Sequence, residues 1–253
     1  MFGICNLAIV PIRAEASDKS ELVSQLLFGE HFEVLEHGKQ WSKIKTAYDF
    51  YEGWIDTKQF QEISPEAFSR LTTQSSVLNG DLIEYVSSEK NVLMPIPLGA
   101  SLSFLNDPSV NVVEFEFEGL KAEGIKPKSD LISTAFMYLH APYLWGGKTP
   151  FGIDCSGFTQ MVYKLNGYTL LRDASQQAAQ GEALSFIEES EPGDLAFFDN
   201  EEGRITHVGI IMENNYIIHA SGKVRIDRLD HLGIYNADVN RHTHKLRVIK
   251  KYI

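Results

Sequence analysis

The sequence predicts an α+β C-terminal domain that is preceded by two small all-β barrels. Short strand-like segments separated by turn residues fill the first half of the chain. Two amphipathic helical segments open the second half, and strand-like segments close it. Helices followed by strands within one region are typical of an α+β domain. The 253 residues suffice for one large domain or for two or three small ones.

The composition narrows the classes of partner. The 34 acidic side chains outnumber the 23 basic ones, and the net charge of −11 argues against nucleic acid and against anionic membrane surfaces. No apolar run approaches the roughly 20 residues that span a bilayer. The two cysteines, Cys5 and Cys155, exclude a disulfide scaffold, and reduced thiols suit a reducing compartment. The oligomeric state stays open.

The N-terminus has two features of a signal peptide and lacks a third. Residues 2–12 are mostly apolar, and Ala14-Glu15-Ala16 resembles a signal-peptidase site. No Lys or Arg precedes the apolar stretch, so the basic n-region is missing. We therefore expect this stretch to be the first strand of a cytoplasmic protein, with secretion or a periplasmic location as the alternative.

The first half divides into three predicted parts. Residues 1–63 predict a small barrel with strands at 6–13, 24–28, 32–36 and 41–46 and a further strand that starts at Gly53. Residues 64–76 are polar and rich in Ser and Thr, which predicts a linker with one helical turn. Residues 77–124 predict a second, divergent barrel, in which 112–118 alternate between apolar and acidic side chains.

Residues 125–253 form the predicted α+β domain. Apolar side chains at helical spacing predict a helix over 131–139 and another that begins near Cys155 and ends at Gly167, and 174–180 predict a short helix. Strands are predicted at 195–198, 207–212, 216–220 and 245–253. The loop Glu213-Asn214-Asn215 joins the middle two as a hairpin.

Cys155 is the candidate nucleophile. A loop rich in Gly and Pro leads into it, so it lies at the first turn of its helix, where backbone N–H groups are unpaired. A helix N-terminus lowers a thiol pKa by less than about one unit, so a thiolate needs a basic partner. The hairpin strands carry His207 and His219, which we expect to lie near each other and near Cys155. Zinc bound by these three residues is the alternative, although their spacing matches no recognised zinc motif.

Five motifs in this region resemble those of the NlpC family of cell-wall cysteine peptidases. They are Tyr143-Leu144-Trp145-Gly146-Gly147, Asp154-Cys155-Ser156-Gly157-Phe158, Glu191-Pro192-Gly193-Asp194-Leu195, His207-Val208-Gly209-Ile210 and His219-Ala220-Ser221-Gly222. The resemblance implies a papain-like domain over 125–253, with Cys155 as nucleophile, His207 as base and His219 as the orienting residue. It implies no cofactor and no metal. It also implies cleavage of peptidoglycan peptides between D-γ-glutamate and a diamino acid.

Residues 1–63 resemble a bacterial SH3-like domain, mainly through Tyr51-Glu52-Gly53-Trp54. Together the two halves resemble the γ-D-glutamyl-L-diamino acid endopeptidases of the dipeptidyl-peptidase VI type, which recycle cell-wall fragments with a free N-terminal L-alanine. The murein peptide L-Ala-γ-D-Glu-diamino acid is then the expected partner. By this resemblance the substrate is bound by Asp154, Ser156, Tyr143, Trp145, Ser175, Tyr51 and Glu15, with Tyr48 and Glu21 as alternates for the last two.

In this interpretation Asp154 pairs with the substrate amine, and a blocked N-terminus leaves its carboxylate buried and unpaired. Two other functions stay open at this point. A catalytically inactive module that binds cell-wall peptide would label slowly with iodoacetamide at Cys155, and a thiol acyltransferase would not turn over the tripeptide. Whether the diamino acid is diaminopimelate or lysine is not determined by the sequence.

Overall fold

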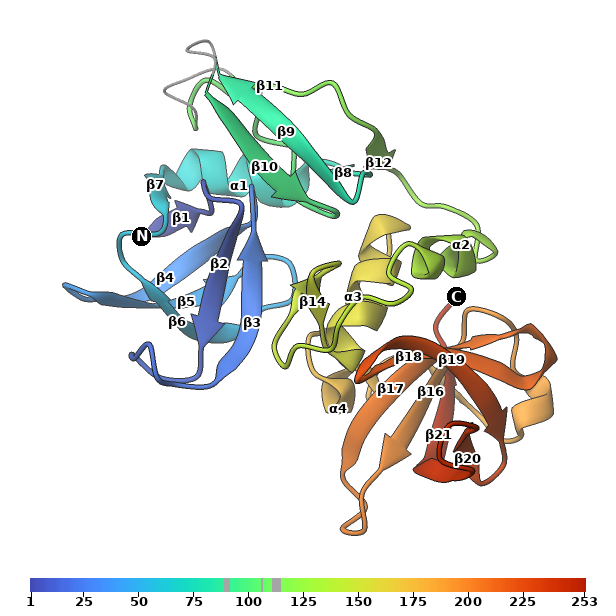
Figure 1. Ribbon diagram of the computed structural model, residues 1–253. Helices are drawn as coiled ribbons and strands as arrows, with labels where there is room; N and C mark the ends of the chain where they lie inside the picture. The colour runs from blue at the N-terminus through green and yellow to red at the C-terminus, as the bar shows by residue number, and fades with distance from the viewer. Residues whose placement is uncertain (89–91, 106, 111–114) are drawn as a thin grey trace. The chain divides into compact units, whose positions relative to one another are not determined.

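The computed structural model describes residues 1–88, 92–105, 107–110 and 115–253 (Figure 1). The chain divides into two compact units, Met1–Ile125 and Lys126–Ile253. In the described ranges, no helix is both long enough and apolar enough to cross a lipid bilayer.

The first unit consists mostly of strands. Its elements are β1 (Phe2–Ile4), β2 (Ile9–Arg13), β3 (Leu22–Leu27), β4 (His31–His37), β5 (Trp41–Thr46), β6 (Glu52–Asp56), β7 (Gln61–Ile63), α1 (Pro65–Thr73), β8 (Val77–Asn79), β9 (Ile83–Ser88), β10 (Leu93–Pro97), β11 (Phe115–Glu116) and β12 (Lys121–Glu123).

The first seven strands form one antiparallel sheet in the order β3-β2-β6-β5-β4-β1-β7. Side chains from most of these strands are buried in a single core that includes Val10, Leu26, Phe32, Ile44 and Ile55. A sheet that buries one face against itself must curl, so this segment has the form of a small barrel. The strands predicted over 6–63 are confirmed to within a few residues at their ends, whereas the stretch 2–12, expected as one strand, is divided between β1 and β2, and β7 was not predicted.

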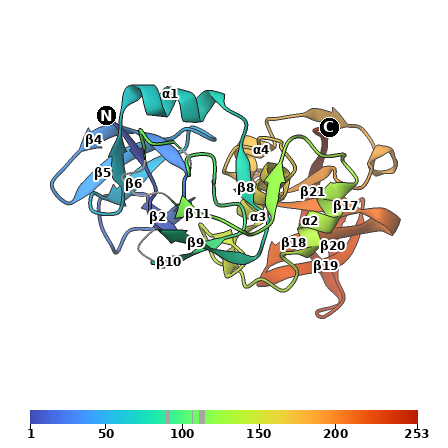
Figure 2. The same ribbon diagram turned by 90° about the horizontal axis from the view of Figure 1, so that it is seen from above.

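Helix α1 lies where the sequence predicted a linker. Ser64 caps it by accepting a hydrogen bond from the Ala67 backbone N–H, and Pro65 occupies the first turn, where a missing N–H costs nothing. Ala67 and Leu71 are buried in the core of the first unit, and the helix packs on β1 and β4 (Figure 2). The prediction of one helical turn was therefore too short, because an apolar side chain every fourth residue is enough to anchor an otherwise polar helix.

Residues 77–124 contribute a three-stranded sheet, β10-β9-β11, and a two-stranded sheet, β12-β8. Their buried side chains, such as Val86 and Ile96, share a core with Phe28 and Leu71 of the preceding segment. The second, divergent barrel stays a prediction. Residues 112–114 of the predicted alternation lie outside the described residues, and over 115–118 the alternation is confirmed, since Phe115 and Phe117 are partly buried while Glu116 and Glu118 are exposed.

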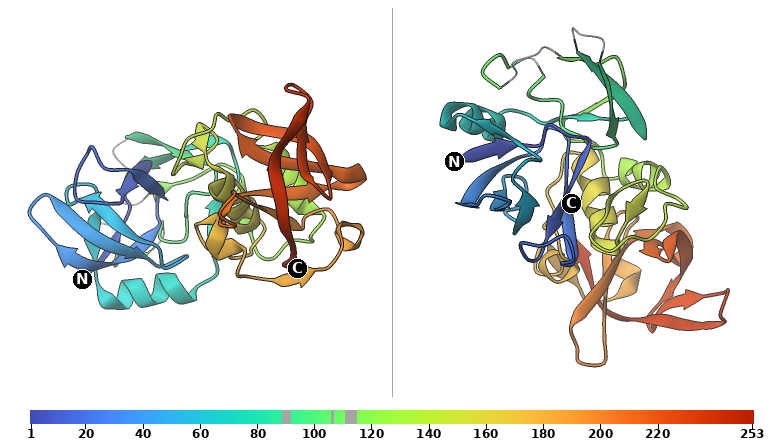
Figure 3. Two further views of the ribbon diagram at one scale, coloured as in Figure 1. Left: turned by 90° about the horizontal axis from the view of Figure 1, so that it is seen from below. Right: turned by 60° about the vertical axis from the view of Figure 1, so that its left-hand side comes forward.

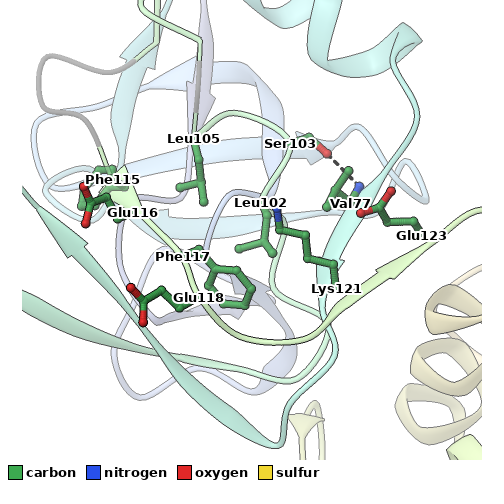
Figure 4. A pocket seen from close by; sticks show the side chains of 10 residues that line it. All are labelled: Val77, Leu102, Ser103, Leu105, Phe115, Glu116, Phe117, Glu118, Lys121 and Glu123. Atoms are coloured by element: carbon green, nitrogen blue, oxygen red, sulfur yellow. Dashed lines mark hydrogen bonds between the residues drawn. The ribbon is translucent and has the colours of Figure 1, made fainter.

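A pocket of about 580 Å³ lies beside these sheets (Figure 4). Apolar and charged side chains line it: Val77, Leu102, Ser103, Leu105, Phe115, Glu116, Phe117, Glu118, Lys121 and Glu123. None of the predicted site residues is among them, so we do not assign the site to this pocket.

The second unit begins with helices and ends with strands, as the sequence predicted. Its elements are α2 (Asp130–Phe136), β13 (Lys148–Thr149), β14 (Gly152–Ile153), α3 (Cys155–Leu165), α4 (Ala174–Gln177), β15 (Glu182–Leu184), η1 (Ile187–Glu189), β16 (Leu195–Asp199), β17 (Ile205–Met212), η2 (Glu213–Asn215), β18 (Tyr216–Ser221), β19 (Lys223–Asp230), β20 (Gly233–Asn236) and β21 (Arg241–Lys251).

Strands β16 to β21 close into a barrel, β15 extends the sheet beside β21, and β13 and β14 form a separate two-stranded sheet. The strands of the large sheet follow the order β15-β21-β16-β17-β18-β19-β20, and β20 pairs back onto β21, the long red strand in Figure 3. Each of the strands β16 to β21 contributes an apolar side chain to one core: Ala196, Phe198, Ile211, Ile217, Leu229, Ile234 and Ile249. The α+β composition is thus observed, while the papain-like description stays a prediction from the resemblance.

Two-residue periodicity decides which polar side chains share the interior of this barrel. His207 lies on the same face of β17 as the core residue Ile211, and His219 lies on the same face of β18 as Ile217. Helix α3 packs on β17 and β18, whose alternate residues, including Ile210 and Ile218, are also fully buried (Figure 1).

Candidate active site

Cys155 is the first residue of helix α3. Asp154 caps this helix by accepting a hydrogen bond of 2.6 Å from the Gly157 backbone N–H. All eleven residues of α3 are buried, which holds the helix start rigidly in the domain. The predicted place of Cys155, where a loop turns into a helix, is confirmed.

The sulfur of Cys155 lies against the strand that carries His207. The thiol is 4.0 Å from the Thr206 carbonyl oxygen, and the Val208 backbone N–H donates a hydrogen bond to the sulfur. Strand β17 pairs with β18 only from Gly209↔His219 to Met212↔Tyr216, whereas its pairing with β16 extends to Ile205. The sulfur therefore meets a stretch of β17 that β18 does not cover.

His207 and His219 form a direct pair, as predicted. His207 Nε2 is 2.8 Å from His219 Nδ1, and their rings meet nearly at right angles. The two residues are diagonal neighbours rather than opposite ones, since His219 lies opposite Gly209.

Gly209 makes this diagonal contact possible. A Cβ atom at this position would lie 2.8 Å from the Cβ atom of His219 and 2.8 Å from Ile217 Cδ1. Without a side chain at 209, the imidazole of His219 can lean along β17 toward His207.

The protonation states differ from the expected thiolate. Burial and, to a smaller extent, the nearby charge of Asp154 raise the pKa of Cys155 to about 12. Burial, followed by the neighbouring His219 and His244, lowers the pKa of His207 well below its usual value. At neutral pH burial thus favours the protonated thiol and the neutral imidazole, so the sulfur anion forms only when His207 accepts the thiol proton.

Arg172 is a buried partner of Asp154 that the sequence reasoning missed. Its guanidinium is 1% exposed and donates to both carboxylate oxygens, at 3.0 and 2.6 Å, and to Ser156 Oγ at 3.0 Å. The Gly146 backbone N–H adds a bond of 2.8 Å to the same carboxylate. Asp154 is therefore already paired in the ligand-free chain, so the expectation that a blocked substrate leaves it unpaired is wrong. The sequence signal for Arg172 was weak. Arg172 directly precedes the segment that contains Ser175, but only its burial shows that it needs an acidic partner.

The other substrate-binding candidates of this unit differ in burial. Tyr143 is partly buried, and burial together with the nearby Cys155 and Asp154 raises its phenol pKa to about 12. Trp145 is 58% exposed, and Ser175 is exposed on α4. Tyr143 thus lies close to the candidate nucleophile, and the surface positions of Trp145 and Ser175 leave their side chains accessible to a ligand.

Tyr51 and Glu15 belong to the first unit. Tyr51 is partly buried just before β6, and its backbone N–H donates to Thr46 Oγ1 at 2.8 Å. Glu15 is exposed in the loop between β2 and β3. Of the alternates, Tyr48 is partly buried and Glu21 is exposed. Their roles in substrate binding stay predictions.

The structure adds three residues around the histidine pair. Asp227 Oδ2 is 3.0 Å from His219 Nε2, and Arg225 donates to both oxygens of Asp227, at 2.6 and 2.9 Å. His244 stacks on His207 with ring centroids 4.1 Å apart. Asp227 and Arg225 lie on β19, for which the sequence reasoning predicted no strand. The alternation of apolar and polar side chains over 224–227 was the signal that could have placed them.

Among the described residues, His207, His219 and His244 could in principle hold a metal, because their ligand atoms lie within 4.8 Å of one another. This group contains His244 where the zinc alternative had Cys155. Two nitrogens on a tetrahedral zinc ion are about 3.4 Å apart, since each Zn–N bond is about 2.1 Å. The 2.8 Å between His207 Nε2 and His219 Nδ1 fits a shared proton better than a shared ion.

Comparison with known proteins places both parts of the chain. The NlpC/P60 family profile matches residues 140–243, and the profile of the bacterial dipeptidyl-peptidase SH3 domain matches residues 12–60. The solved structure of an NlpC/P60 family protein from Bacillus cereus superposes with a TM-score of 0.83 at 20% identity, over 100% of this chain and 99% of that one. It shows a shared fold.

Curated relatives cover most of the chain. A γ-D-glutamyl-L-lysine dipeptidyl-peptidase of Bacillus subtilis is 30% identical over 217 residues, which are 78% of this chain and 71% of the relative. The protein of that name from B. cereus is 28% identical over 81% of this chain and 68% of the relative. Dipeptidyl-peptidase 6 of Lysinibacillus sphaericus is 27% identical over 91% of this chain and 92% of the relative. The chain therefore belongs to the NlpC/P60 family and is a cysteine-type peptidase that carries an N-terminal bacterial SH3 domain.

Proposed function

We propose that this peptidase hydrolyses the bond between D-γ-glutamate and the diamino acid of peptidoglycan-derived peptides, with Cys155 as nucleophile, His207 as base and His219 as the residue that orients His207. One observation carries the assignment of roles. The Cys155 sulfur lies against the backbone on both sides of His207, and His207 is bonded to His219. The names of the three curated relatives support the choice of bond.

The chemistry is acyl transfer. His207 takes the thiol proton of Cys155 while the sulfur attacks the γ-carbonyl carbon of D-glutamate. Proton transfer accompanies attack, because the free thiol has a raised pKa and stays protonated. Backbone N–H groups at the start of α3, including that of Cys155, stabilise the oxyanion. The His207 imidazolium then protonates the leaving amine, and the neutral ring activates the water that releases the acyl group.

The proposed substrate carries a free N-terminal L-alanine. Asp154, Ser156 and Tyr143 bind it on the side of α3 where Cys155 lies, with Trp145 and Ser175 at the exposed edge. Since Arg172 already neutralises Asp154, an incoming ammonium must share this carboxylate with the guanidinium. A further acidic or phenolic group is then needed for strong selectivity, which is the role proposed for Glu15 and Tyr51.

The decisive experiment compares peptides that differ only at the amine. Purified protein is incubated with L-Ala-γ-D-Glu-L-Lys, with its meso-diaminopimelate analogue and with the N-acetylated form of each. We expect release of L-Ala-γ-D-Glu from the free-amine peptides and none with Cys155→Ala. Equal cleavage of the acetylated peptides would refute the amine requirement while leaving the cleaved bond intact. No cleavage of any of the four would refute the substrate itself.

Glu15→Gln and Tyr51→Phe test the proposed contribution of the first unit. Each substitution should raise KM for the free-amine peptide by about 10- to 100-fold with little change in kcat, because a charge-assisted hydrogen bond contributes roughly 1.5–3 kcal/mol. Glu21→Gln and Tyr48→Phe are the matched controls.

The proposed setting is the recycling of murein peptides in the cytoplasm. Fractionation of cells that express the tagged full-length chain tests this location. The tag in the culture medium or the periplasm would contradict it. The runner-up interpretation, a catalytically inactive peptide-binding module, does not agree with membership in a peptidase family with Cys155, His207 and His219 all in place.

A further inference from the structure

We propose that Asp227 is a positioning residue that sets the tautomers of two imidazoles in series, so that the basic nitrogen of His207 is Nδ1, on the side of Cys155. This inference deepens the proposed function and rests on its assignment of Cys155 and His207 as nucleophile and base. Neither Asp227 nor Arg225, which donates hydrogen bonds to Asp227, belongs to the sequence motifs, so their part in the reaction is new.

The chain of contacts runs through the interior of the barrel at one end. His207, His219 and Asp227 lie on β17, β18 and β19, each on the inward face of its strand. The register places Asp227 opposite Ile217 and Arg225 opposite His219, so all of these side chains share one face of the sheet. Separations of 2.8 Å and 3.0 Å join His207 to His219 and His219 to Asp227.

Asp227 is held as a carboxylate. Burial alone raises its pKa, but the hydrogen bonds from His219 and Arg225 outweigh burial and lower it. Arg225 donates to both carboxylate oxygens and also to Asp238 Oδ2 at 2.8 Å, which fixes the guanidinium from its other side. An ionised carboxylate only accepts hydrogen bonds, so the nitrogen that faces it must carry a proton.

The proton positions follow in order. His219 is neutral at pH 7, because burial lowers its pKa more than Asp227 raises it. Its single proton is on Nε2, where it donates to Asp227, and its Nδ1 therefore has a lone pair. His207 Nε2 faces that lone pair and must be the donor, so the lone pair of neutral His207 is on Nδ1.

Nδ1 is the ring nitrogen nearer to the backbone, and the Cys155 sulfur contacts the backbone at the two residues that flank His207. The lone pair and the thiol proton are thus on the same side of the ring. When Sγ–H transfers its proton to Nδ1, His207 becomes an imidazolium whose Nε2–H still donates to His219. The positive charge is stabilised by Asp227 through one neutral ring, with no second proton transfer.

Nitrogen-15 NMR of histidine-labelled protein at pH 7 and without substrate reads these tautomers directly. We expect both His207 and His219 to be protonated at Nε2 and bare at Nδ1. A His207 protonated at Nδ1, or an imidazolium signal for His207, would overturn the proposal. This readout does not depend on turnover, so the tautomers can be confirmed even if the proposed substrate is wrong.

Asp227→Asn and Asp227→Ala test the link between tautomer and rate. Each should abolish the single-tautomer signal of His219 and lower kcat on the order of 10²–10⁴-fold with little change in KM, because general base catalysis contributes that factor. Asp227→Glu should restore part of the single-tautomer signal of His219 and part of kcat. Asp230→Asn is the matched control, because Asp230 lies on β19 like Asp227 and is 2.9 Å from His242 Nε2 on β21, outside the His207–His219 pair. Unchanged tautomers in folded Asp227→Ala would refute the role even if kcat fell.

Discussion

The buried pair of Arg172 and Asp154 gives the most demanding test of the structure. Arg172→Met removes the guanidinium but keeps an unbranched side chain of similar reach. Asp154 then keeps the backbone donors Gly157 N–H and Gly146 N–H but loses two bonds and its counter-ion. Ser156 Oγ, at 3.4 Å, is a third remaining donor to Asp154. Breaking a buried ion pair on one side costs about 3–5 kcal/mol, and the three remaining donors favour the lower end of this range.

The expected effect is a large shift of the unfolding midpoint. With a urea m-value of about 1–3 kcal/mol/M, a loss of 3 kcal/mol lowers the midpoint by at least about 1 M. Adding Asp154→Asn should recover part of the loss, because the double variant leaves no uncompensated charge, with a coupling energy of at least about 1 kcal/mol. Arg204→Met is the control, since the Arg204–Glu202 pair is exposed and contributes less than about 1 kcal/mol.

The chain has its own unfolding probes. Cys155 and Cys5 are both buried thiols, and they lie in different units. Pulsed thiol labelling over a urea series, with mass spectrometry of each cysteine peptide, therefore reports on the two units separately. The Cys155 midpoint should fall in Arg172→Met. A Cys155 midpoint within about 0.3 M of wild type would show that the ion pair does not stabilise this unit and would refute the reasoning.

Three further predictions concern the reacting groups. Iodoacetamide labelling of Cys155 should be slow at pH 7 and should still increase above pH 10, because its thiol pKa is raised to about 12. A labelling rate that stays constant from pH 5 to 8 would instead indicate a preformed ion pair. Slow labelling therefore no longer distinguishes an enzyme from an inactive binder. Gly209→Ala should lower kcat at least about 10-fold with the circular dichroism spectrum unchanged, because the new Cβ atom displaces His219; full activity would contradict the close packing. His244→Ala should raise the pKa of His207 toward its ordinary value, so the acidic limb of the kcat/KM profile should move to higher pH; an unmoved limb would exclude this influence.

The sequence predicted the elements whose signals are local. The apolar spacing after Cys155 located α3, and the short loop between β17 and β18 brought His207 and His219 together. The polar helix α1 and the strand that carries Asp227 were missed, because their patterns are short or their apolar positions few.

By itself, the sequence predicted the family, the place of Cys155 at a helix start and the pairing of His207 with His219, and it proposed Cys155 as the nucleophile. These follow from residue order within single elements or across one short loop. Only the tertiary structure decided that β20 closes onto β21, that Arg172 neutralises Asp154 and that Asp227 stands behind His219. The strands β19 and β20 follow short turns, but the sequence reasoning placed no strand over 223–236 and so could not pair them with their neighbours. The contact between Arg172 and Asp154 depends on which charges the fold removes from water. Burial also decides the direction of the pKa shift of Cys155. Desolvation raises this pKa by more than the helix N-terminus lowers it.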